Sequence, residues 1–146
     1  MPEVATPSPR RGRPAVTSRE QILAAARRII ESEGWRRLTV RRLASELGVG
    51  TTTLYHHVRD REDLLVQLLN EDAARTLAEL ELPADPRERI LAAMLAAHDA
   101  LAATPWAAEV LTVDGFLPRL GAPARRLAEA VVSGAVKLGC SQEQGV

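Results

Sequence analysis

A short polar segment carries side chains that can form several hydrogen bonds with a partner: Thr51, Thr52, Thr53, Tyr55 and His56. Each threonine also presents a methyl group beside its hydroxyl. Surface helices are normally built from glutamate, lysine and arginine, and three threonines in a row lower helix propensity. A helix over residues 51–58 would turn the threonines and His56 outward, with Tyr55 at the edge. The pattern therefore indicates that this helix face is used for contacts with a partner, such as hydrogen bonds and methyl contacts to DNA.

The residues just before this segment predict the element that holds it in place. A helix capped by Thr39 should run to about Leu47, with its apolar side chains turned inward. Gly48 can adopt positive φ and turn the chain, and Val49 fills the corner beneath the turn. Two short helices joined by a tight glycine turn form a helix-turn-helix, which places its second helix in the major groove of DNA.

The rest of the chain also reads as helices, and the predicted fold class is all-α. Apolar residues at helical spacing predict a first helix from a cap at Thr17 or Ser18 to Gly34. A long helix should begin after Asp60 and continue to about Glu81. Further helices are expected over residues 86–103, from a short segment at Pro105, over residues 123–138, and from Ser141 onward.

Charge is unevenly distributed, although the formal net charge is zero. Residues 1–67 contain 12 basic against 8 acidic side chains, and residues 68–146 contain 7 against 11. A basic first half and an acidic second half predict an anionic partner at the N-terminal end.

The first 17 residues hold four of the nine prolines and almost no bulky apolar residue, so we expect a disordered arm. Within it, Arg10-Arg11-Gly12-Arg13-Pro14 resembles an AT-hook, which lies extended in the narrow minor groove of A·T-rich DNA. Alone, the segment would be read as a solvated basic tail. Beside a helix-turn-helix, Arg11 and Arg13 become predicted DNA contacts.

The single cysteine, Cys140, excludes a disulfide within one chain and fits a reducing cytoplasm. No apolar run approaches the roughly 20 residues that span a bilayer, and the N-terminus lacks a signal-peptide core. We therefore expect a cytoplasmic protein without a membrane partner.

Ser18 to Leu69 resembles the DNA-binding domain of the TetR family of bacterial transcriptional regulators. The matching segments occur in family order over about 50 residues: residues 21–26, Gly34, residues 38–44, the turn at 47–49, residues 54–58, Arg61 and residues 63–65. The Leu-Tyr-x-His-Val segment is most similar to the tetracycline-repressor branch. The resemblance implies a three-helix DNA-binding domain joined by a long helix to a helical effector and dimerisation domain.

The resemblance makes residues 51–58 the recognition helix, and implies that the three threonines contact base edges or phosphates, with methyl groups that suit thymine. Tyr55 would place its hydroxyl on a phosphate, and His56 would reach the backbone or bases. Arg41 would contact a guanine or a phosphate, and Thr39 with the first amides of its helix would bind a phosphate.

Arg61 stands where the family has a lysine that anchors a phosphate, so the resemblance implies the same role for it.

Two rival chemistries are weaker. His56 and His57 are adjacent and, on a helix, point about 100° apart, so they do not chelate a metal together; His57 is predicted to pack between helices. No nucleophile set, paired carboxylates or phosphate-cradling loop is found. We expect neither an enzyme nor a bound cofactor or metal.

The second half resembles the family's effector domain only loosely, at residues 103–106 and 120–138. Family members bind a small apolar ligand there, and the binding moves the fourth helix. The candidates for a pocket are Met94, His98, Trp106 and Phe116. Each of Met94, Trp106 and Phe116 is also explained as ordinary core, while His98 is equally a satisfied core histidine.

Family members continue with further helices that build the dimer interface, and this chain ends where the first would begin. We therefore expect an apparently shortened C-terminus, a dimer interface largely absent, and exposed apolar residues over 127–138. The predicted organisation is a basic arm at 1–17, a DNA-binding domain at 18–65 and an incomplete regulatory domain at 66–146.

The predicted function is sequence-specific, ligand-responsive repression by a homodimer on double-stranded operator DNA. The alternative is a helical ligand- or partner-binding module without operator binding of its own.

Overall fold

The computed structural model describes residues 18–113 and 116–139. Helices make up the described elements, and these residues contain no strand, which confirms the all-α prediction. In chain order the elements are α1 (Arg19–Glu33), η1 (Trp35–Arg37), α2 (Val40–Leu47), α3 (Thr51–Tyr55), α4 (Arg61–Glu79), α5 (Pro86–Ala103), α6 (Pro105–Leu111), η2 (Leu117–Arg119) and α7 (Ala122–Lys137).

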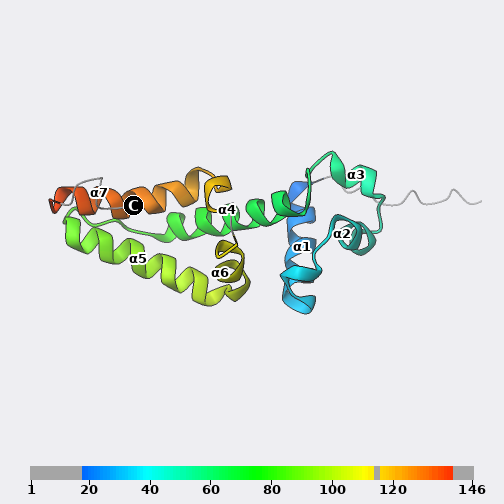
Figure 1. Cartoon of the computed structure of the whole chain (residues 1–146), viewed down its shortest axis with the longest axis horizontal. Helices are drawn as coiled ribbons and strands as arrows, with labels where there is room; N and C mark the ends of the chain where they lie inside the picture. The colour runs from blue at the N-terminus through cyan, green and yellow to red at the C-terminus, as the bar shows by residue number, and fades with distance from the viewer. Residues whose placement is uncertain (1–17, 114–115, 140–146) are drawn as a thin grey trace, which may run out of the picture.

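The molecule is elongated, with α1, α2 and α3 at one end and the α5–α7 pair at the other (Figure 1). Helix α4 runs from the first group into the second, and the first half of the helix buries five apolar side chains in the core: Leu64, Leu65, Val66, Leu68 and Leu69. The core is continuous between the halves, because Val110 of α6 and Phe116 belong to the same buried cluster as α1 and α2. Movement of α4 would therefore shift residues at both ends of the molecule.

Side chains predicted from the sequence as helix caps do cap the helices. The hydroxyl of Ser18 accepts a hydrogen bond from the amide of Gln21, and that of Thr39 accepts from the amide of Arg42. Asp60 accepts from the amide of Asp63 at 2.7 Å. These bonds satisfy amides at the helix starts that have no partner within the helix.

Two helices end earlier in the structure than the sequence predicted. Helix α3 ends at Tyr55 instead of Val58, because the amides of His57 and Val58 both bond to the carbonyl of Leu54. The chain then turns and Val58 enters the core with 3% exposure. Helix α4 ends at Glu79, two residues before the predicted end. The predicted arm and the helix expected from Ser141 lie outside the described residues.

The far end of the molecule is held by the α5–α7 pair, and α4 positions the start of α7. The amide of Gly121 donates to the side-chain oxygen of Asn70 at 2.6 Å, in place of a cap from α7 itself.

In the described part no single helix is long and apolar enough to cross a membrane; α5 and α6 reach that length and composition only together, across a bend of 109°.

Gly134 sets the distance between α5 and α7. A Cβ atom there would lie 2.6 Å from Ile90 and 2.9 Å from the backbone oxygen of Pro86. We expect Gly134→Ala to destabilise the fold by about 1–2 kcal/mol, because overpacking outweighs the roughly 1 kcal/mol gain in helix propensity.

Thermal unfolding followed by circular dichroism measures this effect. The wild type is the reference, because the open position at Gly50 is the N-cap of α3, where alanine is itself unfavourable. A melting temperature of Gly134→Ala equal to or above that of the wild type would contradict the close packing of α5 on α7.

Candidate DNA-binding surface

Helix α3 presents a polar face and buries one anchor. Leu54 is fully buried, whereas Thr51, Thr52 and Thr53 are exposed, as predicted. Tyr55 is 57% exposed, and His56 also lies at the surface. The five side chains predicted to read DNA are therefore all exposed, four of them on α3 and His56 directly after it.

The turn between α2 and α3 fixes the orientation of this face. Gly48 adopts the left-handed conformation, with φ 67° and ψ 32°. The amide of Val49 then returns to the carbonyl of Ala44 at 3.0 Å. A glycine in this conformation ends the helix and satisfies carbonyl groups that have no partner within it. Backbone geometry therefore sets the angle between α2 and α3.

Neighbouring arginines on α2 have different environments. Arg42 bonds to Glu33 of α1 and, at 3.0 Å, to Glu46 of its own helix. The hydrogen bond from Arg42 lowers the pKa of Glu33, and those to Glu33 and then Glu46 raise the pKa of Arg42. Arg41 is exposed and forms no ion pair within the described residues. Arg42 is thus committed to the fold, while Arg41 is available to an anion.

Thr39 is exposed at the start of α2. Its oxygen accepts from the amide of Arg42 at 3.0 Å, which leaves the hydroxyl proton free to donate. The positive end of the helix dipole reinforces an anion at this position. The geometry therefore suits the phosphate contact predicted for Thr39.

Arg61 has a structural role that the sequence did not indicate. Its Nε atom donates to the carbonyl of Leu38 at 2.7 Å, and one Nη donates to the carbonyl of Trp35 at 3.1 Å. The guanidinium also lies over the Trp35 ring, 5.0 Å from its centre. The guanidinium group thus holds the segment between α1 and α2 in place. A phosphate contact by Arg61 remains a prediction, and the phosphate would have to share the same guanidinium donors.

We expect Arg61→Ala to lower the free energy of unfolding by about 1.5–3 kcal/mol, the range for hydrogen bonds made by charged groups. Arg61→Lys should recover little of this, because an ammonium group does not reproduce the planar fork. Urea unfolding of the two variants provides the measurement. Recovery of full stability by lysine would show that only the charge matters.

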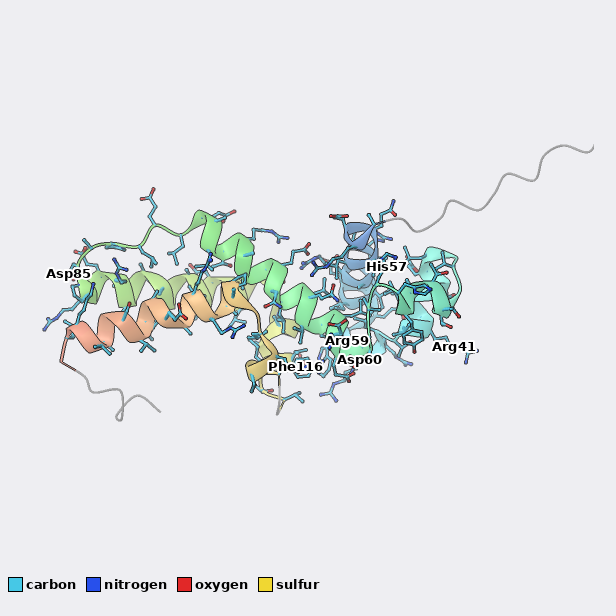
Figure 2. All side chains as sticks on the ribbon, turned by 90° about the horizontal axis from the view of Figure 1, so that it is seen from above. Arg41, His57, Arg59, Asp60, Asp85 and Phe116 are labelled. Atoms are coloured by element: carbon cyan, nitrogen blue, oxygen red, sulfur yellow. The ribbon has the colours of Figure 1, made fainter. Side chains whose placement is uncertain are left out.

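Two surface residues near α3 were not predicted as part of this face. His57 is exposed, so its predicted packing between helices was wrong: the inward position is taken by Val58 instead. Arg59 is exposed in the link to α4, with its amide bonded to Asp63. Figure 2 shows Arg41, His57 and Arg59 at the end of the molecule that holds α1–α3. For Arg59 the available signal was its place as the single basic residue between Val58 and the cap Asp60.

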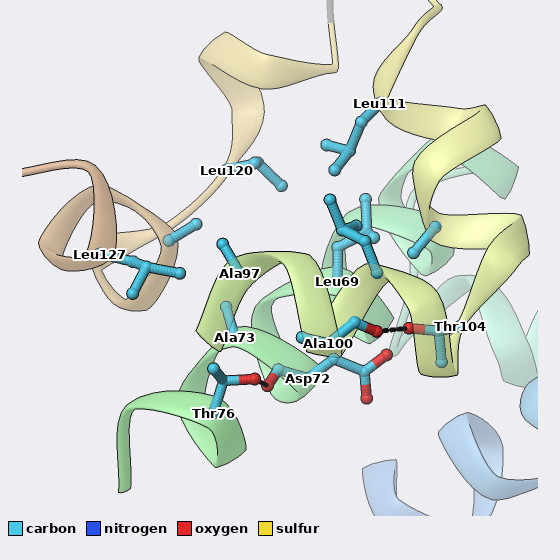
Figure 3. Close-up of a pocket in the computed structure, with 13 residues that line it drawn as sticks. Leu69, Asp72, Ala73, Thr76, Ala97, Ala100, Thr104, Leu111, Leu120 and Leu127 are labelled. Carbon is cyan, nitrogen blue, oxygen red and sulfur yellow. Dashed lines mark hydrogen bonds between the residues drawn. The ribbon is translucent and has the colours of Figure 1, made fainter. Parts of the chain in front are cut away.

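The residues predicted to bind a ligand are not brought together. Met94 is 57% exposed, and His98 is 76% exposed with its ring bonded to the neighbouring Asp99. Phe116 is buried in the core, and Trp106 is partly buried against the same core. A cavity of about 140 Å³ does lie between α4, α5, α6 and α7 (Figure 3), but other residues line it.

Nothing in the described residues resembles a metal site, because no group of three or more histidine, cysteine or acidic side chains is gathered there. His56 and His57 are separate surface groups.

Comparison with known proteins places the helix-turn-helix in a family. The family model described as "Bacterial regulatory proteins, tetR family" matches residues 22–68. Across 60 residues the chain is 43% identical to the HTH-type transcriptional repressor AcnR of Corynebacterium efficiens. Residues 22–68 therefore carry a helix-turn-helix of the TetR family. The AcnR match covers 41% of this chain and 32% of AcnR.

A second TetR-family relative is the HTH-type transcriptional repressor Rv1474c of Mycobacterium tuberculosis, 40% identical over 60 residues, 41% of this chain and 32% of that protein. The chain thus matches about a third of the length of these relatives.

Solved structures extend the likeness beyond the helix-turn-helix. The crystal structure of BioQ with its double-stranded DNA operator superposes with a TM-score of 0.74 at 28% identity, over 87% of this chain and 75% of BioQ. SCO7222, a TetR protein from Streptomyces coelicolor, gives a TM-score of 0.66 at 26% identity, over 87% of this chain and 62% of that chain. The described fold therefore follows TetR-family architecture through its second half.

Proposed function

We propose that this chain is a TetR-family transcriptional regulator that binds operator DNA through α3. The observation that carries the proposal is the exposed face of Thr51, Thr52, Thr53 and Tyr55, held by the buried Leu54. Hydroxyl and methyl groups on a short helix read base edges in the major groove. The likeness to BioQ, solved with its DNA operator, supports the same use of the fold.

Exposed groups around α3 would supply the contacts that do not depend on sequence. Arg41 and Arg59 offer positive charge, and Thr39 offers a donor at the start of α2. Such phosphate contacts fix the register of the protein on DNA, while the threonine face selects the sequence. Arg11 and Arg13 would extend the contacts into the minor groove, and they lie outside the described residues.

The proposal divides the chain within α4. Its first turn contributes Leu64 and Leu65 to the core shared with α1 and α2, which supports a DNA-binding domain over residues 18–65. Later turns of α4 pack with α5 and α7 and line the cavity, which supports a regulatory domain from residue 66. In this scheme the protein is a ligand-responsive repressor, and α4 carries the response.

We also propose a homodimer, in which two copies of α3 are spaced about 34 Å apart, one turn of DNA. Support comes from exposed apolar side chains on α5 and α7: Leu91, Met94, Leu95, Val132, Val136 and Leu138. The prediction that this region would expose apolar residues holds for Val132 and Leu138, whereas Val131 is half-buried and Leu127 lines the cavity. Sedimentation velocity measures the oligomeric state. A chain that binds DNA as a monomer would contradict the homodimer and leave the proposed DNA binding intact.

Fluorescence anisotropy with duplexes from around the protein's own gene tests the function. We expect one duplex to bind about 10³-fold or more above a shuffled duplex, with an affinity that falls as salt rises. Equal affinity for all duplexes would contradict the regulator and favour a helical partner-binding module.

A further inference from the structure

Helix α5 carries three large apolar side chains that face solvent. Leu91, Met94 and Leu95 are 59%, 57% and 52% exposed. Their spacing of three and four residues places them on one side of the helix, opposite the buried Ala93. We call these three side chains the α5 stripe. Large apolar side chains gathered on one exposed face are typical of a protein interaction surface.

The exposed apolar side chains of α7 do not extend the α5 stripe. Gly134 of α7 faces α5, because a Cβ atom there would lie 2.6 Å from Ile90. Val132 and Val136 are each two positions from Gly134, which corresponds to about 200° around a helix. They therefore point away from α5, and the α5 stripe is a separate surface.

Charged groups flank the α5 stripe, and their signs differ between its two sides. At 100° per residue, Arg87 and His98 lie about 40° and 20° to one side of Leu91. Glu88 and Asp99 lie about 60° and 80° to the other side. All four side chains are exposed. One flank is therefore acidic, and the other is basic through Arg87, with His98 adding positive charge when it is protonated.

The side chains of Arg87 and Glu88 are available to a partner. Both residues bond to Asp85 through their backbone amides, and neither side chain forms an ion pair within the described residues. The two side chains point about 100° apart on the helix, so they lie on different flanks of the stripe. An ion pair between them therefore requires a second molecule.

A two-fold axis relates the flanks differently in parallel and antiparallel helix pairs. When two copies of α5 run parallel, the axis sets each basic flank against the acidic flank of the other copy. When they run antiparallel, basic meets basic and acidic meets acidic. Charges beside an apolar seam fix the orientation of paired helices, because like charges repel. The pattern on α5 thus favours a parallel pair, with Arg87 facing Glu88 of the second copy.

We propose that α5 pairs in parallel with α5 of a second copy of this chain, along the α5 stripe. The inference rests on the homodimer of the proposed function and names its interface. Helix α5 runs along the length of the molecule, with its C-terminal end toward the α1–α3 group (Figure 1). Parallel pairing therefore places both copies of α3 at the same end, whereas antiparallel pairing would place them at opposite ends.

Sedimentation velocity of the full chain without DNA tests the interface. Leu91→Glu should raise the dimer dissociation constant at least about tenfold, because it buries two carboxylates in an apolar seam. Val132→Glu is the matched control, since it makes the same change at an exposed apolar position off the stripe. A monomeric wild type, or an unchanged constant in Leu91→Glu, would overturn the pairing and leave the stripe to another occupant, such as residues 140–146 of the same chain.

Exchange of charges tests the role of the flanks. Arg87→Glu and Glu88→Arg should each weaken the dimer about threefold or more, because each sets like charges opposite one another. The double exchange should restore most of the affinity, because the facing flanks again differ in sign. Melting temperatures serve as the control for folding. A double variant no tighter than the single variants would contradict pairing through these flanks.

Cross-linking distinguishes the two orientations. Ala102→Cys, in a Cys140→Ser background, places one thiol on an exposed position about 20° from Leu91 around the helix. Parallel pairing brings the two thiols to the same level, where a short bismaleimide should join them. Antiparallel pairing centred on the stripe separates them by roughly 27 Å along the helices. A dimer that does not cross-link would overturn the parallel orientation.

Operator binding provides a separate readout. Leu91→Glu should weaken operator affinity about tenfold or more, because the two DNA-binding ends are no longer linked. Since self-association is measured without DNA, a chain that dimerises through α5 but binds no DNA would overturn the regulator and leave the α5 pairing intact. Operator binding by a dimer that Leu91→Glu does not disturb would overturn the α5 interface alone.

Discussion

Replacing Thr52 and Thr53 together with alanine should leave the fold intact and reduce the preference for the selected operator about 10- to 100-fold. Both side chains are exposed, so no core contact is lost, and alanine is the better helix former. The loss arises because the double variant gives up two hydroxyls and two methyl groups at the base edges. Each lost base contact is worth about 1 kcal/mol or more of discrimination.

Competition anisotropy, with operator and shuffled duplexes at one salt concentration, measures this preference. Affinity for the shuffled duplex should change little, because phosphate contacts lie outside the two substituted positions. The melting temperature serves as the control for folding. An unchanged operator preference in a folded double variant would exclude the threonine face as the reader of sequence.

The neighbouring arginines of α2 should give opposite results when each is replaced by alanine. Arg41→Ala should weaken binding to all duplexes and reduce the slope of log affinity against log salt by about 1, as expected when one phosphate contact is lost. Its melting temperature should match wild type, because Arg41 is exposed and forms no ion pair in the described part of the chain.

Arg42→Ala should instead lower the melting temperature, because it leaves Glu33 of α1 and Glu46 of α2 without their shared partner. Its salt slope for DNA should stay close to that of the wild type in the folded protein. The pair is a matched comparison, since the charge removed is the same and only the environment differs. A salt slope that falls equally in both variants would show that Arg42 also reaches the phosphates.

Much of the helix-turn-helix could be predicted because its determinants are local. Caps such as Ser18 and Thr39, and the turn at Gly48, depend on a few neighbouring residues. The bounds of α5 were also predicted, from Pro86 to Ala103. The structural roles of Arg42 and Arg61 could not be read in this way, because each depends on which distant groups the fold brings close.

The cavity residues were missed for a further physical reason. Met94 and His98, large side chains on α5, were predicted to line a pocket, yet both face solvent. The inward side of α5 uses small residues, including the buried Ala93 and the cavity-lining Ala97 and Ala100. Small residues permit close helix packing, and a space between helices depends on their distance, which single-sequence patterns do not specify.

The most direct test of DNA recognition by α3 is selection of bound duplexes from a pool with a randomised central segment, followed by sequencing. The proposal predicts one enriched motif for the wild-type chain, and loss of that motif's information in the Thr52→Ala, Thr53→Ala double variant while total binding persists. A wild-type chain that enriches no motif, or a double variant that enriches the same motif equally, would contradict sequence recognition by this helix.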